Sequence, residues 1–390
     1  MDIVERLEGV ERLGRFMRLL NHDNVASRDA YKRWRGVDEN AKRMADIFGY
    51  KPEGDMPSIT TLIGVDFHPE NPLIKVNYTS TAHNTLHAFP HGWTPAVRMC
   101  RGSIFDSEGN LVAHAFPKFF NRGEHPETLV PPTGQSWSAT DKRDGHLGIN
   151  YHYGWNWKIT TRGDFESPSS RLGEEILRRD HLRTQWRSAV DPDITVLTEI
   201  IDPTTKVHVD YAGTSGLVLI GAYNRKSLQD YTYSDLVVLA GLLKIPVTEA
   251  YEGTDLDALV ALMDDLTIRG REGFVVRFAQ GLRMKIKFAT YINLMVEAKL
   301  SPKYLMQRVL SRNLDKMIKN LDSEIIAKAH EMLGRILRVQ FMPNITPADL
   351  KARRAYLYSL VPPEESTTYY RGICREFLSF VDERASLTSV

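Results

Sequence analysis

Strand-like patterns fill the middle of the sequence and stop at about residue 290, and this change limits the folds that the chain can adopt. Apolar residues run or alternate through segments such as 101–106, 194–201 and 283–288, as expected for β-strands separated by turns. From residue 290 on, apolar residues recur at helical spacing instead. We therefore predict an α+β fold, with antiparallel sheets and flanking helices followed by an all-α domain at 293–390.

The same patterns predict the positions of further elements. An amphipathic helix is expected to open the chain, and residues 1–95 would form a helical and β extension of a first domain at 1–292. Helices are also expected at 170–189 and 233–243, and strands at 207–211 and 217–223.

The composition excludes few classes of function. The 390 residues carry a formal net charge of +1 and contain no long apolar run, so we expect two domains and no membrane span. Cys100 and Cys374 lie far apart in the sequence, which favours buried thiols in a reducing cytoplasm over a disulfide. The charged start of the chain is unlike a secretory signal. A net charge near zero still permits a local basic face for nucleic acid.

The segment Lys142-Arg-Asp144-Gly145 places an amine and a carboxylate just before a predicted strand at 147–151. The glycine allows a tight turn and a close approach to a ligand. An unprotonated lysine is a nucleophile suited to covalent catalysis. Ordinary hairpin turns with a solvated lysine have the same composition, so the segment alone leaves both interpretations open.

Other polar residues lie on or beside predicted strands. Glu199 lies inside an apolar run, where a carboxylate is costly unless it is paired or bound to a cation. Lys285 and Lys287 point to the same side of one strand, where they would either hold an anion or guard an exposed sheet edge. Lys118 and Arg122 are interleaved with two aromatic residues, which fits either a cationic wall for phosphate or an ordinary hairpin end.

Taken in chain order, these residues resemble the nucleotidyltransferase signature of ATP-dependent ligases and capping enzymes. The series is Lys142-x-Asp144-Gly145, Arg162-Gly163, Glu199, Glu272-Gly273 and Lys285-x-Lys287. The further segments that resemble the RNA ligase 1 family, the bacteriophage-type enzymes, are Arg101-Gly-Ser-Ile-Phe105, Lys118-Phe-Phe-Asn121 and Tyr291. The resemblance covers about residues 95–292. Arg162 is a departure, because relatives often carry lysine there and the two side chains differ in geometry.

This resemblance implies a nucleotidyltransferase fold and an ATP-dependent RNA ligase. Lys142 would attack the α-phosphorus of ATP, release pyrophosphate and carry AMP as a lysyl phosphoramidate. The AMP would pass to the 5′-phosphate of an RNA strand, and a 3′-hydroxyl would then attack that activated end. Residues 1–292 would be the adenylyltransferase domain. The mildly basic helices expected at 293–390 would offer a surface for RNA.

The resemblance also implies which cations would act on the phosphates of ATP. Lys285 and Lys287 would hold the α-phosphate and so take part in catalysis. Arg101 and Lys118 would orient the β- and γ-phosphates of the leaving group.

The carboxylates and the remaining residues would bind metal and nucleotide. Asp144, Glu199 and Glu272 would organise Mg²⁺ or Mn²⁺, directly or through water. Glu199 would alternatively hold the ribose hydroxyls. Arg162 and Tyr291, together with Glu199 and Glu272, would contact the nucleotide.

The expected substrate is RNA with 5′-phosphate and 3′-hydroxyl ends, such as a cleaved tRNA, and an end-healing kinase or phosphatase is a candidate partner. We expect a monomer in the cytoplasm, or in the host cytoplasm for a phage-encoded chain. Two alternatives stay open. One is a DNA ligase or capping-type nucleotidyltransferase, although these usually append a small β-barrel rather than helices. The other is a catalytically silent RNA-binding protein on the same fold.

Overall fold

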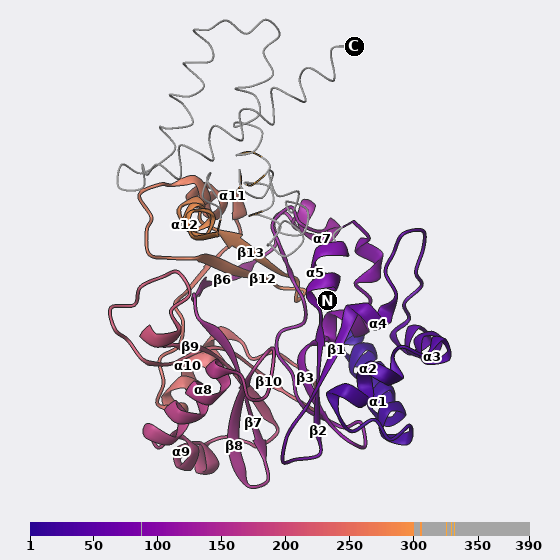
Figure 1. The fold of residues 1–390 in the computed structure, drawn as a ribbon. Helices are drawn as coiled ribbons and strands as arrows, with labels where there is room; N and C mark the ends of the chain where they lie inside the picture. Colours follow the sequence, from indigo (N-terminus) through magenta and orange to yellow (C-terminus); the bar gives the residue numbers. More distant parts are fainter. Residues whose placement is uncertain (87, 300–304, 306–324, 326–328, 330, 332–390) are drawn as a thin grey trace, which may run out of the picture. The chain divides into compact units, whose positions relative to one another are not determined.

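The computed structural model describes residues 1–86 and 88–299, together with positions 305, 325, 329 and 331. The chain divides into two compact units, Met1–Tyr291 and Ile292–Val390. Nearly all the helices and strands labelled in Figure 1 belong to the first unit. The all-α domain expected at 293–390 lies almost entirely outside the described residues.

The N-terminal region of the first unit folds as helices packed on an antiparallel sheet of order β1-β2-β3-β4. The strands are β1 (Ile63–Phe67), β2 (Leu73–Tyr78), β3 (Arg101–Asp106) and β4 (Leu111–Ala113). The helices are α1 (Ile3–His22), α2 (Arg28–Trp34), α3 (Asp38–Phe48), α4 (Ile59–Leu62), α5 (Ser80–Thr85) and α6 (Pro95–Met99), with a 3-10 turn η1 (Pro90–Gly92).

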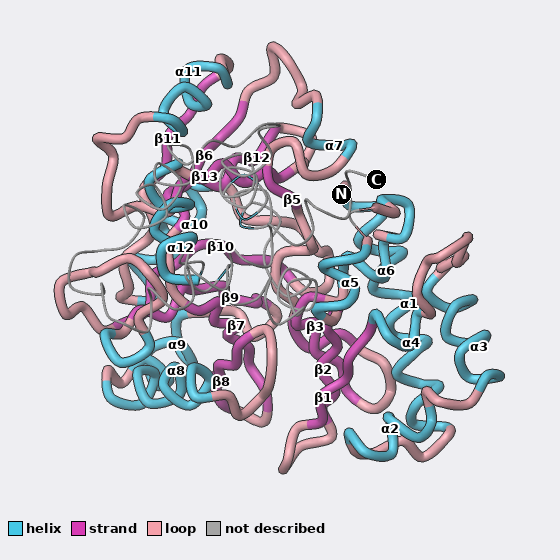
Figure 2. Tube along the Cα trace, turned by 45° about the horizontal axis from the view of Figure 1, so that its top comes forward, coloured by secondary structure: helices cyan, strands magenta, loops and turns pink. Residues whose placement is uncertain are grey.

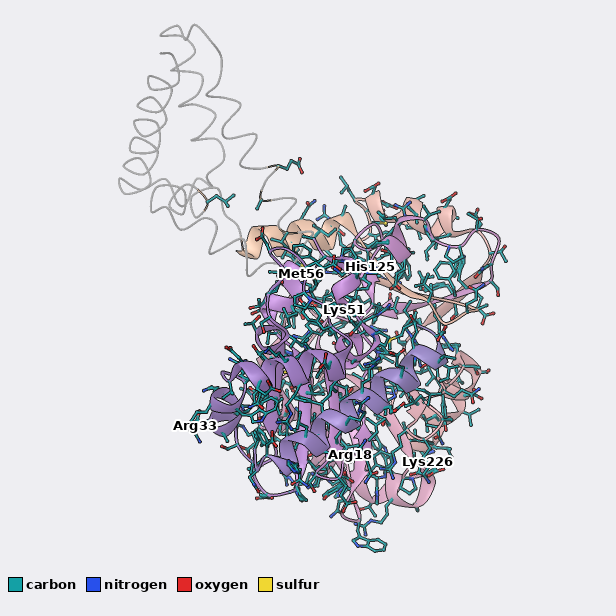
Figure 3. The ribbon with its side chains drawn as sticks, turned by 90° about the vertical axis from the view of Figure 1, so that its right-hand side faces the viewer. Arg18, Arg33, Lys51, Met56, His125 and Lys226 are labelled. Carbon is teal, nitrogen blue, oxygen red and sulfur yellow. The ribbon has the colours of Figure 1, made fainter. Side chains whose placement is uncertain are left out.

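Helix α1 shows why these residues form a helix that covers the sheet. It begins at a capping box between Asp2 and Glu5, which satisfies backbone amides at the helix start. On its apolar face Phe16 and Leu20 are fully buried in the core that the N-terminal helices share with the first sheet, whereas Val4 and Leu7 near its start are exposed. Figure 3 views this side of the molecule, where Arg18 of α1 and Arg33 of α2 extend to the exposed surface.

A second antiparallel sheet has the order β10-β9-β7-β8. Its strands are β7 (His146–Tyr153), β8 (Asn156–Thr161), β9 (Ile194–Ile201) and β10 (Gly216–Asn224). One face packs against α8 (Pro168–Arg179), α9 (Leu182–Ala189) and α10 (Tyr233–Leu243) around Trp157 and Trp186. The other face packs against the first sheet through Ile104, Ile149 and Leu197. Two sheets therefore lie between two layers of helices (Figures 1 and 2).

A third sheet has the order β11-β6-β12-β13-β5. Its strands are β5 (Phe120–Asn121), β6 (Trp137–Lys142), β11 (Ala250–Gly253), β12 (Gly273–Phe278) and β13 (Arg283–Lys287). The short elements nearby are α7 (Pro126–Leu129), η2 (Pro203–Thr205), α11 (Leu256–Ala261), η3 (Leu262–Asp264) and α12 (Ala289–Lys299). The chain passes from β6 of this sheet almost directly into β7 of the second sheet. Lys142, the last residue of β6, therefore lies where the two sheets meet.

The structure confirms a mixed fold of antiparallel sheets with flanking helices and corrects three local expectations. The short pair β13–β5 is parallel. The expected helix at 170–189 is two helices, because His181 adopts a left-handed backbone conformation between them. The segment 207–211 is not a strand. Within the part of the chain that the structure describes, no helix has the length and apolar character needed to cross a membrane.

Candidate active site

The pairing of β6, β12 and β13 arranges the candidate residues in rows on one face of the third sheet. Residues directly opposite each other in antiparallel strands point to the same side, and so do alternate residues along a strand. The rows, in the order β6, β12, β13, are Lys142–Gly273–Lys287, then Thr140–Val275–Lys285, then Ser138–Arg277–Arg283. Successive rows are about 7 Å apart. The face therefore carries the candidate nucleophile at one end and a column of cations along β13.

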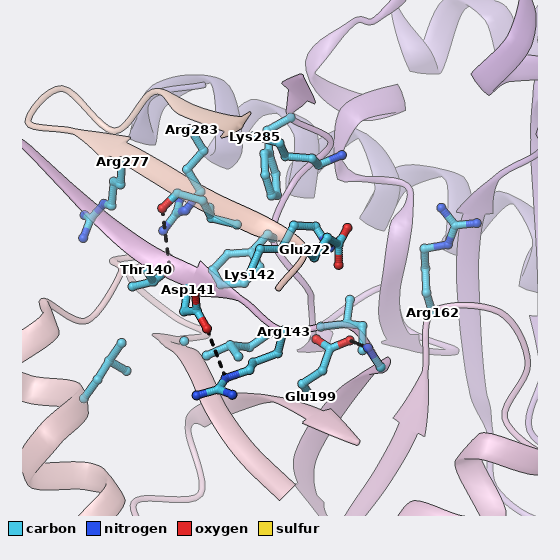
Figure 4. A pocket seen from close by; sticks show the side chains of 18 of the residues that line it. Thr140, Asp141, Lys142, Arg143, Arg162, Glu199, Glu272, Arg277, Arg283 and Lys285 are labelled. Atoms are coloured by element: carbon cyan, nitrogen blue, oxygen red, sulfur yellow. Dashed lines mark hydrogen bonds and ion pairs between the residues drawn. The ribbon is translucent and has the colours of Figure 1, made fainter. Parts of the chain in front are cut away.

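This face forms one wall of a cavity of about 460 Å³, which is within the usual range of ~300–1,000 Å³ for small-molecule sites. The other walls come from the first two sheets, which contribute Arg101 of β3 and Glu199 of β9. The turn after β8 adds Arg162. Figure 4 shows Lys142 and Glu272 close together, with Glu199 on another strand and Arg162 in the turn after β8 on other sides of the cavity. The cavity therefore gathers residues that are up to 186 positions apart in the sequence.

The amine of Lys142 is held by a buried carboxylate. Lys142 Nζ lies 2.7 Å from Oε1 of Glu272, and their side chains are 24% and 5% exposed. Glu272 is placed by Gly273, whose φ of 152° is a conformation that favours glycine. A Cβ at position 273 would overlap the carbonyl oxygen of Ile286 on β13. The Glu-Gly pair is thus needed for the close packing of β12 on β13 beside the lysine.

The surroundings of Glu199 favour the protonated form of its carboxyl group. Burial, together with the nearby carboxylates of Glu272 and Asp144, raises the pKa of Glu199 to about 8 against the attraction of Lys142. Its Oε1 accepts a hydrogen bond from the backbone N–H of Gly145 at 3.1 Å. A cation bound next to this carboxylate would favour its ionised form.

Lys285 lies in a buried, cation-rich part of the cavity. Burial lowers the pKa of Lys285 well below its usual value, and Lys118, Arg101 and Lys287 lower it further, whereas Glu124 raises it. Its ammonium nitrogen lies 4.9 Å from the ring centre of Phe119. An anion bound between these cations would relieve their mutual repulsion.

Comparison with known proteins gives this arrangement a family. A family model described as RNA ligase matches residues 99–293, which is half of the chain. The chain belongs to this RNA ligase family. The matched region of this family member runs from the last residue of α6 into helix α12 and includes every strand of the third sheet.

Individual relatives of this family member match over shorter lengths. A protein of Thermovibrio ammonificans named "Putative RNA ligase" is 35% identical over 153 residues, which are 38% of this chain and 38% of that protein. A mutant of Naegleria gruberi RNA ligase with ATP and Mn is 16% identical, with a TM-score of 0.35 over 43% of this chain and 52% of that one. An apo mutant of the same ligase gives a TM-score of 0.38 over 48% and 60%. The chain thus spans less than two thirds of each of these relatives.

The cavity of this family member brings together seven of the ten residues singled out from the sequence. These are Arg101, Lys142, Arg162, Glu199, Glu272, Lys285 and Lys287. Arg162 is held by Tyr78 of β2, whose hydroxyl accepts a hydrogen bond from Nη1 at 2.8 Å. Burial alone would raise the pKa of Tyr78, but Arg162, Lys118 and Arg101 together lower it.

Lys118 does not line the cavity, in contrast to the expectation that it would face phosphate. It is 2% exposed, lies 3.6 Å from Oε1 of Glu124 and stacks over the rings of Trp93 and Phe120. Phe120 from its own segment and Trp93, the residue after η1, therefore lie beside its ammonium. Its charge acts on the cavity through Lys285.

Asp144 and Tyr291 also lie outside this cavity. One carboxylate oxygen of Asp144 accepts hydrogen bonds from the backbone N–H groups of His208 and Val209 at 2.7 and 2.6 Å. The other oxygen accepts one from the hydroxyl of Tyr291 at 2.6 Å. Asp144 lines a smaller cavity of about 210 Å³ beneath the segment 202–214. One oxygen thus holds that segment and the other holds Tyr291 of α12, and this arrangement differs from the expected metal ligand.

The described residues contain no group of three His, Cys, Asp or Glu side chains that could hold a metal ion. The expected set of Asp144, Glu199 and Glu272 is therefore not assembled as a closed ligand set. Of these three carboxylates, Glu199 and Glu272 line the large cavity and Asp144 does not.

Arg277 and Arg283 line the cavity but were not recognised in the sequence. Together with Arg6 of α1 they surround the carboxylate of Asp230, which is 4% exposed. The nearest distances from Asp230 to Arg6 and Arg283 are both 2.8 Å, and the distance to Arg277 is 3.3 Å. The alternation along β13 that marked Lys285 and Lys287 extends to Arg283 and could have identified it.

Proposed function

We propose that this RNA ligase family member is an ATP-dependent RNA ligase that joins 5′-phosphate and 3′-hydroxyl ends of RNA through a lysyl-AMP intermediate on Lys142. The observation that carries the proposal is the position of the Lys142 amine. The amine nitrogen faces a nucleotide-sized cavity and lies 2.7 Å from Oε1 of Glu272. It shares a row of the sheet with Lys287, and Lys285 lies in the next row.

In the first step, Nζ of Lys142 forms a bond to the α-phosphorus of ATP while the bond from that phosphorus to the bridging oxygen breaks and pyrophosphate leaves. Attack requires the lone pair of the amine, so the ammonium must first give up one proton, to the Glu272 carboxylate or to water, and the amine must then turn from Glu272 toward the phosphorus. Lys285 and Lys287 hold the α-phosphate, and Arg101 orients the leaving phosphates. These three cations would act by positioning the phosphates and neutralising their charge, which supply most of the catalysis in phosphoryl transfer.

The remaining residues support the nucleotide at its edges. Arg162 contacts the nucleotide from the turn after β8. Lys118, which lies behind the cavity wall, acts through its charge on Lys285. Tyr291, whose hydroxyl donates to Asp144, supports the turn that carries Lys142.

A divalent cation, Mg²⁺ or Mn²⁺, fits this cavity at Glu199 and Glu272. Mg²⁺ is commonly held by one or two carboxylates together with water and substrate phosphates, so a third protein ligand is not required. The chemistry of Glu199 supports this assignment, because its surroundings raise the pKa of this carboxyl to about 8 and a cation beside it would favour the charged form. When bound, the metal would neutralise negative charge on the phosphates.

The second and third steps act on RNA. The AMP moves from Lys142 to the RNA 5′-phosphate, and the 3′-hydroxyl of a second end displaces it. We extend the proposal to a cleaved RNA such as tRNA, prepared by an end-healing kinase or phosphatase, and to RNA binding by the basic region 293–390. A monomeric protein of the cytoplasm is part of the same proposal.

Incubation with radioactive ATP tests the nucleophile. Wild-type protein should form a labelled protein–AMP adduct in the presence of Mg²⁺ or Mn²⁺, and Lys142→Ala should form none, because the change removes the amine that would carry AMP. Lys158→Met, which alters a lysine outside the cavity, is the matched control and should keep the adduct. Adduct formation in Lys142→Ala would refute the assignment.

Labelling with GTP and end-joining assays with RNA and DNA separate the alternative functions. An adduct from GTP rather than ATP would indicate a capping-type enzyme, and joining of DNA ends but not RNA ends would indicate a DNA ligase. A wild-type protein that binds RNA and never acquires AMP would be a silent RNA-binding protein.

A further inference from the structure

Lys75 of β2 is a buried lysine that the proposed chemistry does not use. Its side chain is 1% exposed, and its ammonium nitrogen lies 4.2 Å from the ring centre of Phe165. It donates hydrogen bonds to Oγ1 of Thr160 at 2.8 Å and to the carbonyl oxygen of Thr161 at 2.9 Å. Both acceptors are uncharged oxygens.

A charged amine in this position reduces the stability of the fold. Burial lowers the pKa of Lys75 to about 7; the charges that face it are Asp66 of β1 and Asp164, which raise the pKa, and Arg28 of α2, which lowers it. Arg28 itself binds both aspartates, each at 2.6 Å. An apolar side chain would avoid the desolvation of the amine. We therefore expect a role for Lys75 other than stabilising the fold, and its hydrogen-bond partners indicate one.

The acceptors of Lys75 immediately precede Arg162 in the chain. The same strand supplies two more contacts to this turn. Asn77 Nδ2 donates to the carbonyl oxygens of Arg162 and Gly163, and Tyr78 accepts from the guanidinium of Arg162. Strand β2 of the first sheet thus holds the turn 161–163 of the second sheet at its backbone and at its side chain. Residues 162 and 163 are otherwise exposed to solvent.

We propose that Lys75 is a positioning residue that fixes the turn 161–163 so that Arg162 faces the nucleotide cavity. This inference rests on the proposed function, because it assumes that Arg162 contacts the nucleotide. Lys75 itself lies outside the cavity and does not touch the reacting atoms. Its contacts fix the backbone of the turn, whereas Tyr78 fixes the guanidinium.

The hold on the turn depends on the charge of the amine. Below about pH 7 the amine of Lys75 is an ammonium, and its hydrogen bonds are charge-assisted and stronger than those of a neutral amine. Above that pH the amine loses its charge in the folded protein and the hold weakens. The ratio of wild-type to Lys75→Met activity should therefore be largest below pH 7 and fall as the pH rises, whereas a purely structural effect would leave the ratio constant.

The test compares AMP incorporation in the full-length protein carrying Lys75→Met, Arg162→Ala or both changes. Lys75→Met should raise the KM for ATP about tenfold or more, with a smaller effect on kcat, because misplacement of a binding group is costly. The same change should have little effect in the Arg162→Ala background, since its effect passes through Arg162. Equal losses in both backgrounds, or an unchanged KM in Lys75→Met, would overturn the proposal. The half-buried lysine change Lys158→Met on β8 is the control.

Tryptic cleavage after Arg162, followed by mass spectrometry, provides a readout that does not depend on activity. Cleavage should be faster in Lys75→Met than in the wild type and in Lys158→Met, because the exposed turn is released. An unchanged cleavage rate would overturn the proposal. If wild-type protein acquires no AMP, the proposed function fails, and this readout still tests the positioning of the turn.

A second variant guards against a failure of Lys75→Met to fold. Thr160→Val keeps the shape of the side chain and removes the Oγ1 acceptor. It should shift the KM for ATP and the tryptic cleavage in the same direction by a smaller factor. Wild-type values for both measurements in a folded Thr160→Val protein would count against the proposal.

Discussion

Gly273 is the residue on which the geometry of the Lys142–Glu272 pair depends. Its left-handed φ and its contact with the carbonyl of Ile286 leave no space for a Cβ. Gly273→Ala should lower the free energy of unfolding by about 1–3 kcal/mol from backbone strain. It should also reduce AMP incorporation strongly, because β12 would have to move away from β13 and carry Glu272 with it. Urea unfolding and the labelled-ATP assay measure the two effects.

Gly241→Ala is the matched control for this prediction. Gly241 lies in helix α10, where a Cβ would meet open space. The change should leave activity intact and stabilise the helix by up to about 1 kcal/mol. If Gly273→Ala behaved in the same way, β12 and β13 would not be packed as closely as described.

Strand periodicity predicted the orientation of some site residues and not of others. Lys285 and Lys287 alternate along one strand, and their shared direction follows from the sequence alone. The surroundings of Lys118 cannot be predicted in this way, because Glu124 lies in a later loop and Trp93 follows the 3-10 turn η1. Asp144 likewise differs from the expectation because its hydrogen-bond partners lie 64 or more residues further along the chain.

At the scale of an element, the segment 202–214 is organised by Asp144 rather than by a strand ladder. Asp144→Ala removes the acceptor of the His208 and Val209 amides and of the Tyr291 hydroxyl. Hydrogen exchange at these two amides should accelerate by tenfold or more, because each lost charge-assisted bond contributes about 1.5–3 kcal/mol. Hydrogen–deuterium exchange measured without metal and without nucleotide gives the rates.

Asp210→Asn is the control for this element. Asp210 lies in the same segment and is exposed, paired with Lys206 at 2.8 Å. Its replacement should leave the exchange of the His208 and Val209 amides unchanged. Slow exchange of both amides in Asp144→Ala would show that Asp144 does not hold the segment and would favour the metal role expected from the sequence.

Elements with strong local signals were predicted well, and those defined by distant partners were not. Helix α10 has the predicted bounds because Thr232 and Asp235 form a capping box at its start. Residues 207–211 alternate in polarity like a strand, yet the backbone amides of His208 and Val209 bond to the carboxylate of Asp144. The break between α8 and α9 at Asp180 and His181 contains no glycine or proline, so the sequence did not indicate it.

At the scale of the first unit, Asp230 joins parts of the chain that are far apart in sequence. It binds Arg6 of α1, Arg277 of β12 and Arg283 of β13. Burial alone would raise the pKa of Asp230, but Arg283, Arg6 and Arg277 hold it well below its usual range. The carboxylate is therefore charged in the fold at neutral pH.

Asp230→Asn should lower the free energy of unfolding at pH 7 by about 3–5 kcal/mol, because three arginines lose their buried counter-charge. The contribution of Asp230 is present above the unfolded pKa of about 4 and is lost as the pH falls toward the depressed folded pKa. The difference between wild type and variant should therefore shrink below pH 4. Urea unfolding at several pH values measures it, and a constant difference would contradict the linkage.

The meeting of the three sheets could not be predicted from the sequence. Periodicity identifies strands and the faces they present, but it does not state which strands pair. The order β11-β6-β12-β13-β5 brings together strands separated by more than 150 residues, from β5 at 120 to β13 at 287. The resemblance supplied the ordered motifs, and the strand register then placed them on one face.

The register of the hairpin β12–β13 limits how this chain can change by insertion. The loop between the two strands, residues 279–282, can lengthen without altering which way the later side chains point. One additional residue inside β13, in contrast, would turn Lys285 and Lys287 to the opposite side of the sheet, away from the nucleophile. Length variation among functional descendants of this sequence should therefore accumulate in that loop and be absent from the strand.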